Sequence, residues 1–456
     1  MNGDRRSIAW ACGAIGAASF IPCAAGGQTL TDALVSAYQH NPKLIQQRIT
    51  LQVKDEEVPA ALANWRPTIT AQASDSYVQD RISVPGDVYA QDNVRNQYPG
   101  DSYGLSITQY LYRGGRTSSQ LRQARADVKS GEAQLMSVEE AVLLQVISDY
   151  IDLGVDDDVL DLSDQRLADA RIQLTGVQSQ LRGGEASKLD LAAAEGAVQD
   201  AVLARAQAST QEWTLKMSFL RDTGLEPAKL APIEPPQTGG DTLERVYQLA
   251  DIDNFDVRAA QCDLDAAEAA LESAKSEGRP TVAIEGVFSH EDGVNLPTES
   301  EDVEAVTLQV KVPIYSGGQL SSQIRGARLA VEAKHAALDA VRASARASAG
   351  AAFVQLDGAA KSFDAWRAKV QALNLALEGV RHQRDAGERT YADVIAAEEA
   401  VFVARVQAVQ AKGDLIYARY QLADEVGQLT AQNLSLPVDT FDPEKYLHKV
   451  AWGPGR

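Results

Sequence analysis

The sequence predicts an internally duplicated protein of mixed α and β structure, in which each half combines long helices with one β-hairpin. Three observations support this prediction. Proline is absent from two long stretches, residues 100–226 and 314–436, which favours uninterrupted helices. The motifs of the first half recur in the same order in the second half. Four short segments alternate apolar and polar residues, as strands with one apolar face do.

The composition excludes several classes of protein. Of the 456 residues 45% are hydrophobic, so the chain is not disordered. With 63 acidic and 43 basic residues the net charge is −20, which argues against a nucleic-acid partner. Three cysteines are too few for a disulfide framework, and the five histidines show no metal-ligand spacing. No nucleophile, base and orienting group stand at a recognisable spacing. We therefore expect no enzyme, no metal and no cofactor.

The N-terminal residues 1–27 have the character of an export signal. Two arginines precede an apolar stretch, and small residues follow it. We expect cleavage near Ala25 or Gly27, which leaves Cys262 in the mature chain. The alternative is a lipoprotein anchored at Cys23, although the residue before this cysteine is not small. Beyond the signal no apolar run is long enough for a transmembrane helix, so any membrane crossing would use strands.

The first structural repeat is predicted to span residues 28–224. It contains short helices, a β-hairpin at about 67–112, a long helix over 116–182 and a helix over 185–223. In the long helix a coiled-coil seam recurs every seven residues, at Leu121, Val128, Leu135 and Val142. Several aspartates between residues 156 and 164 lack the glycine of a calcium loop, so we expect them to form a solvated helix face.

The second structural repeat, residues 241–427, follows a Pro-rich linker at 225–240. Its predicted elements are a β-hairpin at about 280–315, a long helix over 319–385 and a helix over 388–426, and a C-terminal segment at 428–456 follows. LYRGGR and IYSGGQ stand 203 residues apart, as do GGEASKLD and AGERTYAD, whereas the two RPT motifs stand 213 residues apart. The difference in length therefore falls within the hairpin, as expected of rigid helices joined by a surface loop.

The alternating segments are long enough for tilted membrane strands, which need ~9–11 residues. A soluble sandwich hairpin would alternate in the same way, so the pattern alone leaves both interpretations open. Tyrosines stand where the aromatic girdle of a membrane barrel would lie, at Tyr77, Tyr103, Tyr110, Tyr112 and Tyr315. Four strands cannot close such a barrel, because the smallest known type uses eight. The expected fold class is therefore a mixed α and β membrane protein that closes its barrel with several copies.

Glycine and proline mark the predicted joints between the elements. Glycine pairs lie where a tilted strand turns into a helix and needs φ freedom, at Gly114, Gly115, Gly317 and Gly318. Pro67 and Pro280 mark the joints at which a helix gives way to a strand. The helical turns at the far end carry Gly183, Gly184 and Gly387.

In this order, the motifs resemble those of the TolC-like outer-membrane channels, particularly the type I secretion and multidrug-efflux members. The resemblance covers nearly the whole chain after the signal and rests on TLTDAL, NWRP, LYRGGR, IYSGGQ, GGEASKLDLAAAE, AGERTYADVIAAEE and YARYQLADEVGQL. It implies a homotrimer whose twelve strands form one outer-membrane β-barrel, continued into the periplasm by a twelve-helix α-barrel. The implied partners are a periplasmic adaptor protein, an inner-membrane ABC or RND-type transporter and outer-membrane lipid.

The resemblance also implies a periplasmic gate. By motif position, Asp393 rings the constriction, and Arg389 links to Asp190 of the first repeat. Three copies of Asp393 on one axis would bind cations. An aspartate just after a turn also favours the helix dipole, so a purely structural role stays open. The sequence departs from the pattern at Ala396, where efflux members often carry a second acidic residue.

The resemblance implies an exit duct that passes substrates from the periplasm to the exterior within a tripartite type I secretion or multidrug efflux system. The alternative is an exported periplasmic coiled-coil adaptor that forms no pore. The strands of such an adaptor would be soluble and folded onto its own helices.

Overall fold

The computed structural model describes residues 27–82, 94–233, 242–292 and 300–451. Within these ranges the chain forms fourteen helices and strands, with the bounds α1 Leu30–His40, α2 Pro42–Asp55, α3 Glu57–Ala63, β1 Thr68–Ile82, β2 Val94–Arg113, α4 Arg116–Gly183, α5 Lys188–Thr223, α6 Leu243–Ile252, α7 Phe255–Ser276, β3 Thr281–Asp292, β4 Ser300–Lys311, α8 Gln319–Asp385, α9 Tyr391–Glu425 and α10 Glu444–Ala451. Nearly all of the predicted signal at 1–27 lies outside the described residues, as do part of the linker and the two hairpin loops.

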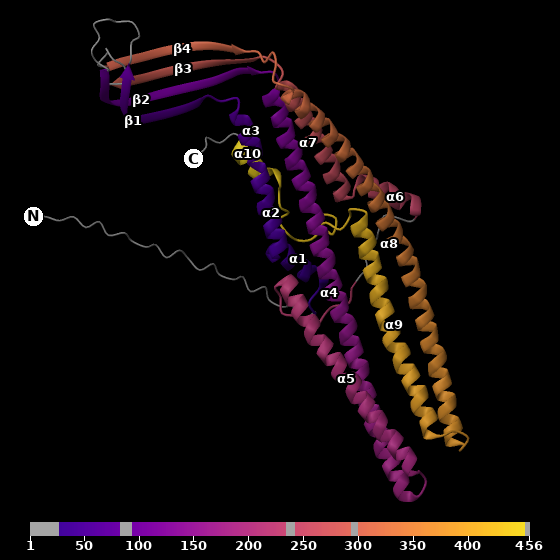
Figure 1. The fold of residues 1–456 in the computed structure, drawn as a ribbon. Coiled ribbons are helices and arrows are strands. Elements are labelled where there is room, and N and C mark those ends of the chain that lie inside the picture. The colour runs from indigo at the N-terminus through magenta and orange to yellow at the C-terminus, as the bar shows by residue number, and fades with distance from the viewer. Residues whose placement is uncertain (1–26, 83–93, 234–241, 293–299, 452–456) are drawn as a thin grey trace, which may run out of the picture.

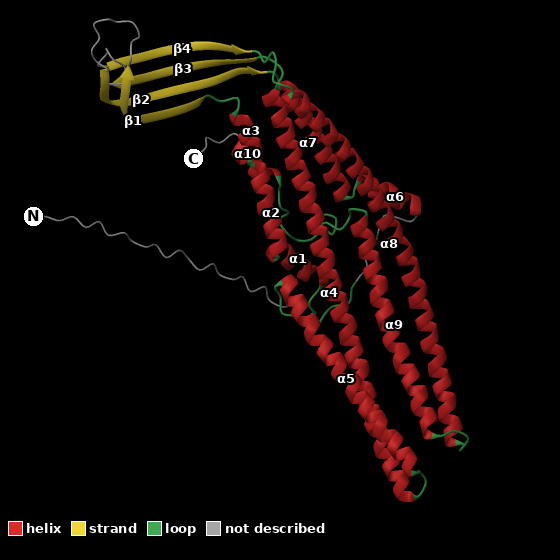
Figure 2. Cartoon of the chain, viewed as in Figure 1, coloured by secondary structure: helices red, strands yellow, loops and turns green. Residues whose placement is uncertain are grey.

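The molecule is elongated, with the sheet at one end and the helices extending away from it (Figure 1). The two long helices, α4 and α8, run from the sheet toward the opposite end (Figure 2). In the part of the chain that the structure describes, no helix covers either face of the sheet (Figure 2). The soluble interpretation requires strands that fold onto the helices of the same chain. The described strands do not do so.

The four strands form one antiparallel sheet in the order β1–β2–β3–β4. Its register places one row of apolar residues across the sheet, because Ile69 lies opposite Ile107, which lies opposite Gly286, which in turn lies opposite Val306. The adjacent row is polar and contains Thr68, Thr108, Glu285 and Thr307. Since side chains alternate along a strand, the sheet has one apolar and one polar face. The strand expected to reach about residue 315 ends at Lys311, because Pro313 has no N–H to donate.

Short helices join end to end to make composite rods beside the long helices. Asn41 caps α2 and donates its Nδ2 to the carbonyl of Asp222 at the end of α5, at 3.1 Å. In the second half, Asn254 caps α7 and donates its Nδ2 to the carbonyl of Glu425 at the end of α9, at 3.2 Å. Each repeat therefore contributes one long helix and one composite rod. The duplicated asparagines make the same connection in both halves.

Apolar side chains of the long helices, including Val128 of the predicted seam, pack against the composite rods. Ala124 and Val128 of α4 form a cluster with Val58 and Ala61 of α3. Leu338 and Ala345 of α8 form the equivalent cluster with Val257 and Leu264 of α7. The principal core lies midway along the helices, where Tyr150, Phe219, Leu44 and Leu429 are buried together.

Two local features differ from the sequence prediction, and the first rod has a break that was not predicted. The helices expected from residues 185 and 388 begin at Lys188 and Tyr391, because Ser187 and Thr390 cap them. The first rod is broken at Glu56, because Pro59 cannot donate to the carbonyl four residues earlier. Asp156 is 8% exposed rather than solvated, and burial raises its pKa to about 6. The solvated-face prediction is therefore wrong for Asp156.

Candidate functional site

The joints between strands and helices have the backbone geometry that the glycine pairs predict. The φ values of Gly114, Gly115, Gly317 and Gly318 are 64°, 90°, 62° and 86°, in the left-handed region. A Cβ atom at Gly114 would lie 2.7 Å from the carbonyl oxygen of Ser276, so the joint also requires a close backbone approach. Pro67 and Pro280 stand directly before β1 and β3. These joints turn each strand into the long helix that follows it.

The opposite end of the molecule carries two tight helical turns (Figure 1). Gly184 and Gly387 have φ values of 82° and 80°, whereas Gly183 is the last residue of α4. Both turns are open on the outside, since a Cβ atom at any of these three glycines would meet nothing within 4 Å. The requirement for glycine here is therefore conformational.

Asp190 and Asp393 each lie in the first turn of their helix and form equivalent capping boxes with the residue that caps it. Ser187 donates its backbone N–H and its hydroxyl to Asp190 Oδ2, at 2.9 and 2.6 Å. Thr390 donates the same two groups to Asp393 Oδ2, at 2.9 and 2.8 Å. Hydrogen bonds from Ser187 lower the pKa of Asp190, and hydrogen bonds from Thr390 lower the pKa of Asp393. Both aspartates are therefore anionic at neutral pH and have a structural role in the single chain.

The structure brings Arg389 close to Asp393 and not to Asp190. Arg389 Nη1 lies 3.8 Å from Asp393 Oδ1, one helical turn away, and its Nε donates to Gln383 Oε1 at 3.3 Å. Within the described chain no hydrogen bond or ion pair joins Arg389 to Asp190. The predicted link between the two turns is therefore absent from the single chain.

A polar network that the sequence did not predict lies near these turns. It joins the helical hairpin of α4 and α5 to the helical hairpin of α8 and α9. Gln173 of α4 donates its Nε2 to both carboxylate oxygens of Glu398 of α9, at 2.8 Å each. Arg381 of α8 donates to Glu398 Oε1 at 2.8 Å, and the Tyr391 hydroxyl donates to Gln173 Oε1 at 3.0 Å. The only signal in the sequence was an acidic pair, Glu398 and Glu399, on an otherwise Ala-rich helix. This network ties α4 to α8 and α9.

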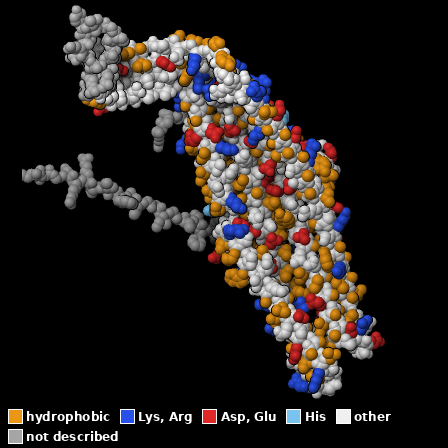
Figure 3. Space-filling view, viewed as in Figure 1, with side chains coloured by type: hydrophobic (Ala, Val, Ile, Leu, Met, Phe, Trp, Pro, Cys, Tyr) orange, Lys and Arg blue, Asp and Glu red, His pale blue; other side chains and the backbone are white. Residues whose placement is uncertain are grey.

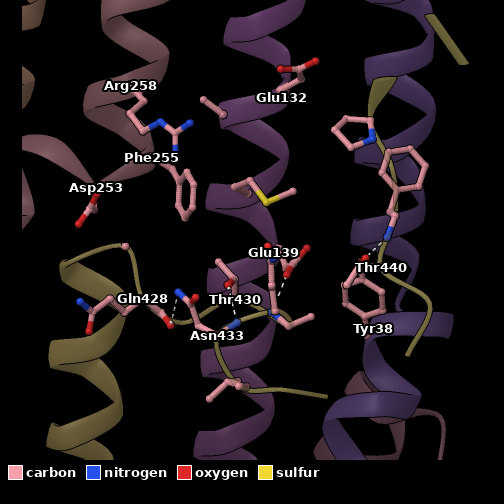
Figure 4. A pocket seen from close by; sticks show the side chains of 18 of the residues that line it. Tyr38, Glu132, Glu139, Asp253, Phe255, Arg258, Gln428, Thr430, Asn433 and Thr440 are labelled. Atoms are coloured by element: carbon pink, nitrogen blue, oxygen red, sulfur yellow. Dashed lines mark hydrogen bonds between the residues drawn. The ribbon is translucent and has the colours of Figure 1, made fainter. Parts of the chain in front are cut away.

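A second unpredicted feature is a cavity of about 1020 Å³ between α4, α7 and the C-terminal segment (Figure 4). Two adjacent acids of α4 hold this segment, because Glu139 Oε1 accepts the N–H of Ala431 at 2.8 Å and Glu140 Oε1 accepts that of Leu429 at 3.0 Å. Burial, reinforced by the charge of Asp424, raises the pKa of Glu140 to about 9. The segment is therefore fastened across the helices near their middle.

Among the described residues, no group of three or more His, Cys, Asp or Glu side chains is placed to hold a metal ion. Within the same ranges, no helix has the length and hydropathy required to span a membrane.

The described residues thus form a four-stranded sheet with an uncovered apolar face, continued by long helical rods. A model of the outer membrane efflux protein family matches residues 33–214 and 246–428, which correspond to the two repeats. The chain belongs to the outer membrane efflux protein family. It is an outer-membrane protein that extends into the periplasm, and it is not an enzyme.

Known relatives and solved structures agree with this assignment. The chain is 28% identical over 429 residues to the outer membrane efflux protein BepC of Brucella suis. The aligned region covers 94% of this chain and 91% of BepC. It is 23% identical to the outer membrane protein TolC of Vibrio cholerae, over 80% of this chain and 85% of TolC. The fold matches the Campylobacter jejuni CmeC outer membrane channel with a TM-score of 0.76 at 14% identity, over 93% of this chain and 89% of CmeC. The predicted resemblance to TolC-like channels is confirmed.

Proposed function

We propose that three copies of this chain close a twelve-stranded β-barrel in the outer membrane. The observation that carries this proposal is the open sheet. Strands β1 and β4 form its two edges, and each has backbone N–H and C=O groups with no partner strand on one side. In a bilayer such groups must be paired, because unpaired ones cost several kcal/mol each, ~2–7. Pairing β4 of one copy with β1 of the next satisfies both edges.

The two faces of the sheet support the same arrangement. The apolar face carries exposed Ile69, Leu105 and Leu308, which would contact lipid. The polar face carries Thr68, Thr108 and Thr307, which would line a water-filled lumen. Membrane barrels alternate in this way along every strand. The competing interpretation, an exported adaptor without a pore, requires helices of the same chain to cover this apolar face, and none of the described helices does so.

The helical rods extend the proposed cylinder into the periplasm. Each chain presents the long helices α4 and α8 and the two composite rods. Three chains then supply twelve rods, which equals the number of strands above them. A continuous tunnel follows from this match. Conduction through such a tunnel requires neither tight binding of the substrate nor its chemical conversion.

The proposed gate lies at the helical turns far from the sheet. There, three copies of Asp393 would form an anionic ring at the tunnel mouth, and Arg389 and Asp190 would connect neighbouring turns in the assembled trimer. The anionic state of Asp393 in the single chain is compatible with a cation-binding ring. Like-charge repulsion among three copies would raise the pKa of Asp393 again. The network centred on Glu398 would hold the two hairpins of each copy in the closed position.

The proposed role is the exit duct of a tripartite type I secretion or multidrug efflux system. Its partners would be a periplasmic adaptor protein and an inner-membrane ABC or RND-type transporter. Relatives named for efflux and for secretion support keeping both systems in the proposal. One is named an outer membrane efflux protein, and another is the proteases secretion protein PrtF of Dickeya chrysanthemi.

Planar-bilayer recording from the purified oligomer tests the proposal. We expect heat-resistant trimers that give discrete, cation-selective conductance steps. A protein that salt releases from membranes without detergent, and that conducts nothing, would identify the pore-free adaptor instead.

A further inference from the structure

The junction between the sheet and the helices carries a charge opposite to that of the whole chain. Residues 64–68, 109–126, 275–284 and 309–330 meet there and contain ten basic residues but one acidic residue, Glu277, whereas the chain has 43 basic and 63 acidic residues. On the face seen in Figure 3, Lys and Arg side chains gather where the sheet meets the helices. A local excess of this size in an acidic protein requires an explanation.

Four of these cations have a structural explanation. Lys275 pairs with Glu272 at 2.7 Å. Arg113 Nη1 donates to Asn64 Oδ1 at 2.7 Å, and its guanidinium lies 4.7 Å from the centre of the Tyr110 ring. Arg279 Nη1 donates to the carbonyl of Gly114 at 2.9 Å. Arg116 pairs with Glu277 at 3.2 Å. These contacts hold the joints of the two repeats together.

Four arginines on the long helices have no such explanation. Arg122 and Arg125 of α4 stand 7 and 10 residues after Gly115, and Arg325 and Arg328 of α8 stand 7 and 10 residues after Gly318. All four are exposed. Arg122 donates to Ser119 Oγ at 3.2 Å, whereas the described chain offers the other three no hydrogen bond or ion pair. The duplication has therefore preserved a pair of exposed cations at the same level in both halves.

The face on which the α4 arginines lie can be located relative to the C-terminal segment. Arg122, Arg125 and Lys129 line a groove between α4 and α7, and Lys129 also lines the cavity that the C-terminal segment borders. The arginines therefore share the face that this segment crosses. In a cylinder of rods, a segment that crosses several rods lies on the outer side. Acids of α7 border the same groove, and the pKa of Glu272 is lowered by its hydrogen bond from Lys275, with a smaller contribution from the charge of Arg122. No acid of the described residues forms an ion pair with Arg122 or Arg125.

The depth of the four arginines corresponds to the lower boundary of a membrane. Tyr112 and Tyr315 stand just before the joints, where an interfacial aromatic band is expected. Along α4 the arginines lie ~9 and ~14 Å beyond the first helical residue, at 1.5 Å per residue. The Cα–Cβ bonds of a helix tilt toward its N-terminus, which in α4 and α8 is the membrane end. Long basic side chains also extend toward the interface, so the guanidinium groups reach back to the polar headgroup layer.

We propose that Arg122, Arg125, Arg325 and Arg328 form a cationic belt that binds the phosphate groups of anionic phospholipids in the periplasmic leaflet of the outer membrane. The inference rests on the proposed trimeric barrel, which places twelve such arginines around its lower rim. A guanidinium suits this ligand, because its planar fork binds a phosphate through two hydrogen bonds. Contacts of this kind would fix the depth of the channel in the membrane and keep its tunnel perpendicular to the bilayer.

The test measures lipid preference at the belt by fluorescence. Replacing Trp213, Trp366 and Trp452 by Phe leaves Trp65, which is exposed next to the joint, as the reporter in the mature protein. Trimers are reconstituted with brominated phosphatidylglycerol or brominated phosphatidylethanolamine, and quenching of Trp65 reports which lipid is adjacent. We expect a several-fold preference for phosphatidylglycerol at low salt, falling toward equality at 1 M salt, where the screening length is about 3 Å.

The decisive variant combines Arg122→Gln, Arg125→Gln, Arg325→Gln and Arg328→Gln. Its preference should fall to about equal quenching by the two lipids. The matched control replaces four exposed cations away from the joint by Gln, namely Arg171, Arg182, Lys188 and Arg367, and should keep the parental preference.

Two results would overturn the proposal: a variant that keeps the preference of the parent, or a control that loses it equally. If the variant keeps its lipid preference but no longer binds the adaptor, the belt contacts an acidic protein surface, and the lipid proposal is wrong. Conductance of the same trimers is recorded in parallel. Parental trimers that conduct normally without any lipid preference contradict the belt alone, whereas a parental chain that forms no conducting trimer contradicts the proposed function.

Discussion

Glu398 offers the most direct test of how the two hairpins of one chain are held together. Its side chain is 23% exposed and accepts hydrogen bonds from Gln173 and Arg381, so Glu398→Ala removes both. A hydrogen bond to a charged group contributes about 1.5–3 kcal/mol. The half-exposed pair with Arg381 adds about 0.2–1 kcal/mol. The variant should therefore weaken the closed arrangement by about 2–4 kcal/mol per chain, which shifts an opening equilibrium roughly 30- to 700-fold.

The assay is single-channel recording in planar bilayers, together with the sensitivity of cells to an antibiotic that an intact outer membrane excludes. We expect a larger conductance and greater antibiotic sensitivity in Glu398→Ala. The matched control is Glu378→Ala, because Glu378 is an exposed acid one turn before Arg381 and makes no hydrogen bond or ion pair within the described chain. A Glu398→Ala channel with parental conductance, or a control that opens equally, would refute the reasoning.

Three further predictions concern the gate and the C-terminal segment. Asp393→Asn should reduce cation selectivity and block by trivalent cations in reconstituted channels, and unchanged block would remove Asp393 from the constriction. Arg389→Ser should raise conductance and antibiotic leakage, and a variant indistinguishable from the parent would leave the Arg389 link without support. The third prediction concerns Glu140, whose pKa rises from 4.5 in the unfolded chain to about 9 in the folded chain. Between these two pH values the unfolded chain has lost the Glu140 proton, whereas the folded chain still holds it, so raising the pH favours unfolding. Thermal stability should therefore fall as the pH rises from 5 to 9, and Glu140→Gln should flatten this dependence; an equal slope in the variant would show that Glu140 is not its source.

The repeats and their joints could be predicted because their determinants are local. Gly114 and Gly317 carry the φ requirement themselves, and Pro67 and Pro280 stop the preceding helices. The sequence also contains the signal for the observed starts of α5 and α9, because Ser187 and Thr390 each stand three residues before an aspartate, as in a capping box.

The connections between distant segments could not be predicted from the sequence. Asn41 and Asp222 are 181 residues apart, and Gln173 and Glu398 are 225 residues apart, so no local pattern connects them. The acidic run around Asp156 predicts a solvent-exposed helix face. Asp156 is nevertheless buried, because α5 packs across α4 at this position. In the proposed trimer, the contacts of Arg389 and Asp190 would involve neighbouring copies, which a single chain does not contain.

Cysteine cross-linking between the edge strands tests the closure of the barrel most directly. In a Cys262→Ala background, Ala71 of β1 is replaced by Cys and combined in turn with Cys in place of Val306, Leu308 or Val310 of β4, because the stagger of the barrel sets which pair meets. If three copies close one cylinder, oxidation in membranes should give covalent dimers and trimers and nothing larger. Monomers bridged within one chain, or a ladder that continues beyond three, would contradict it.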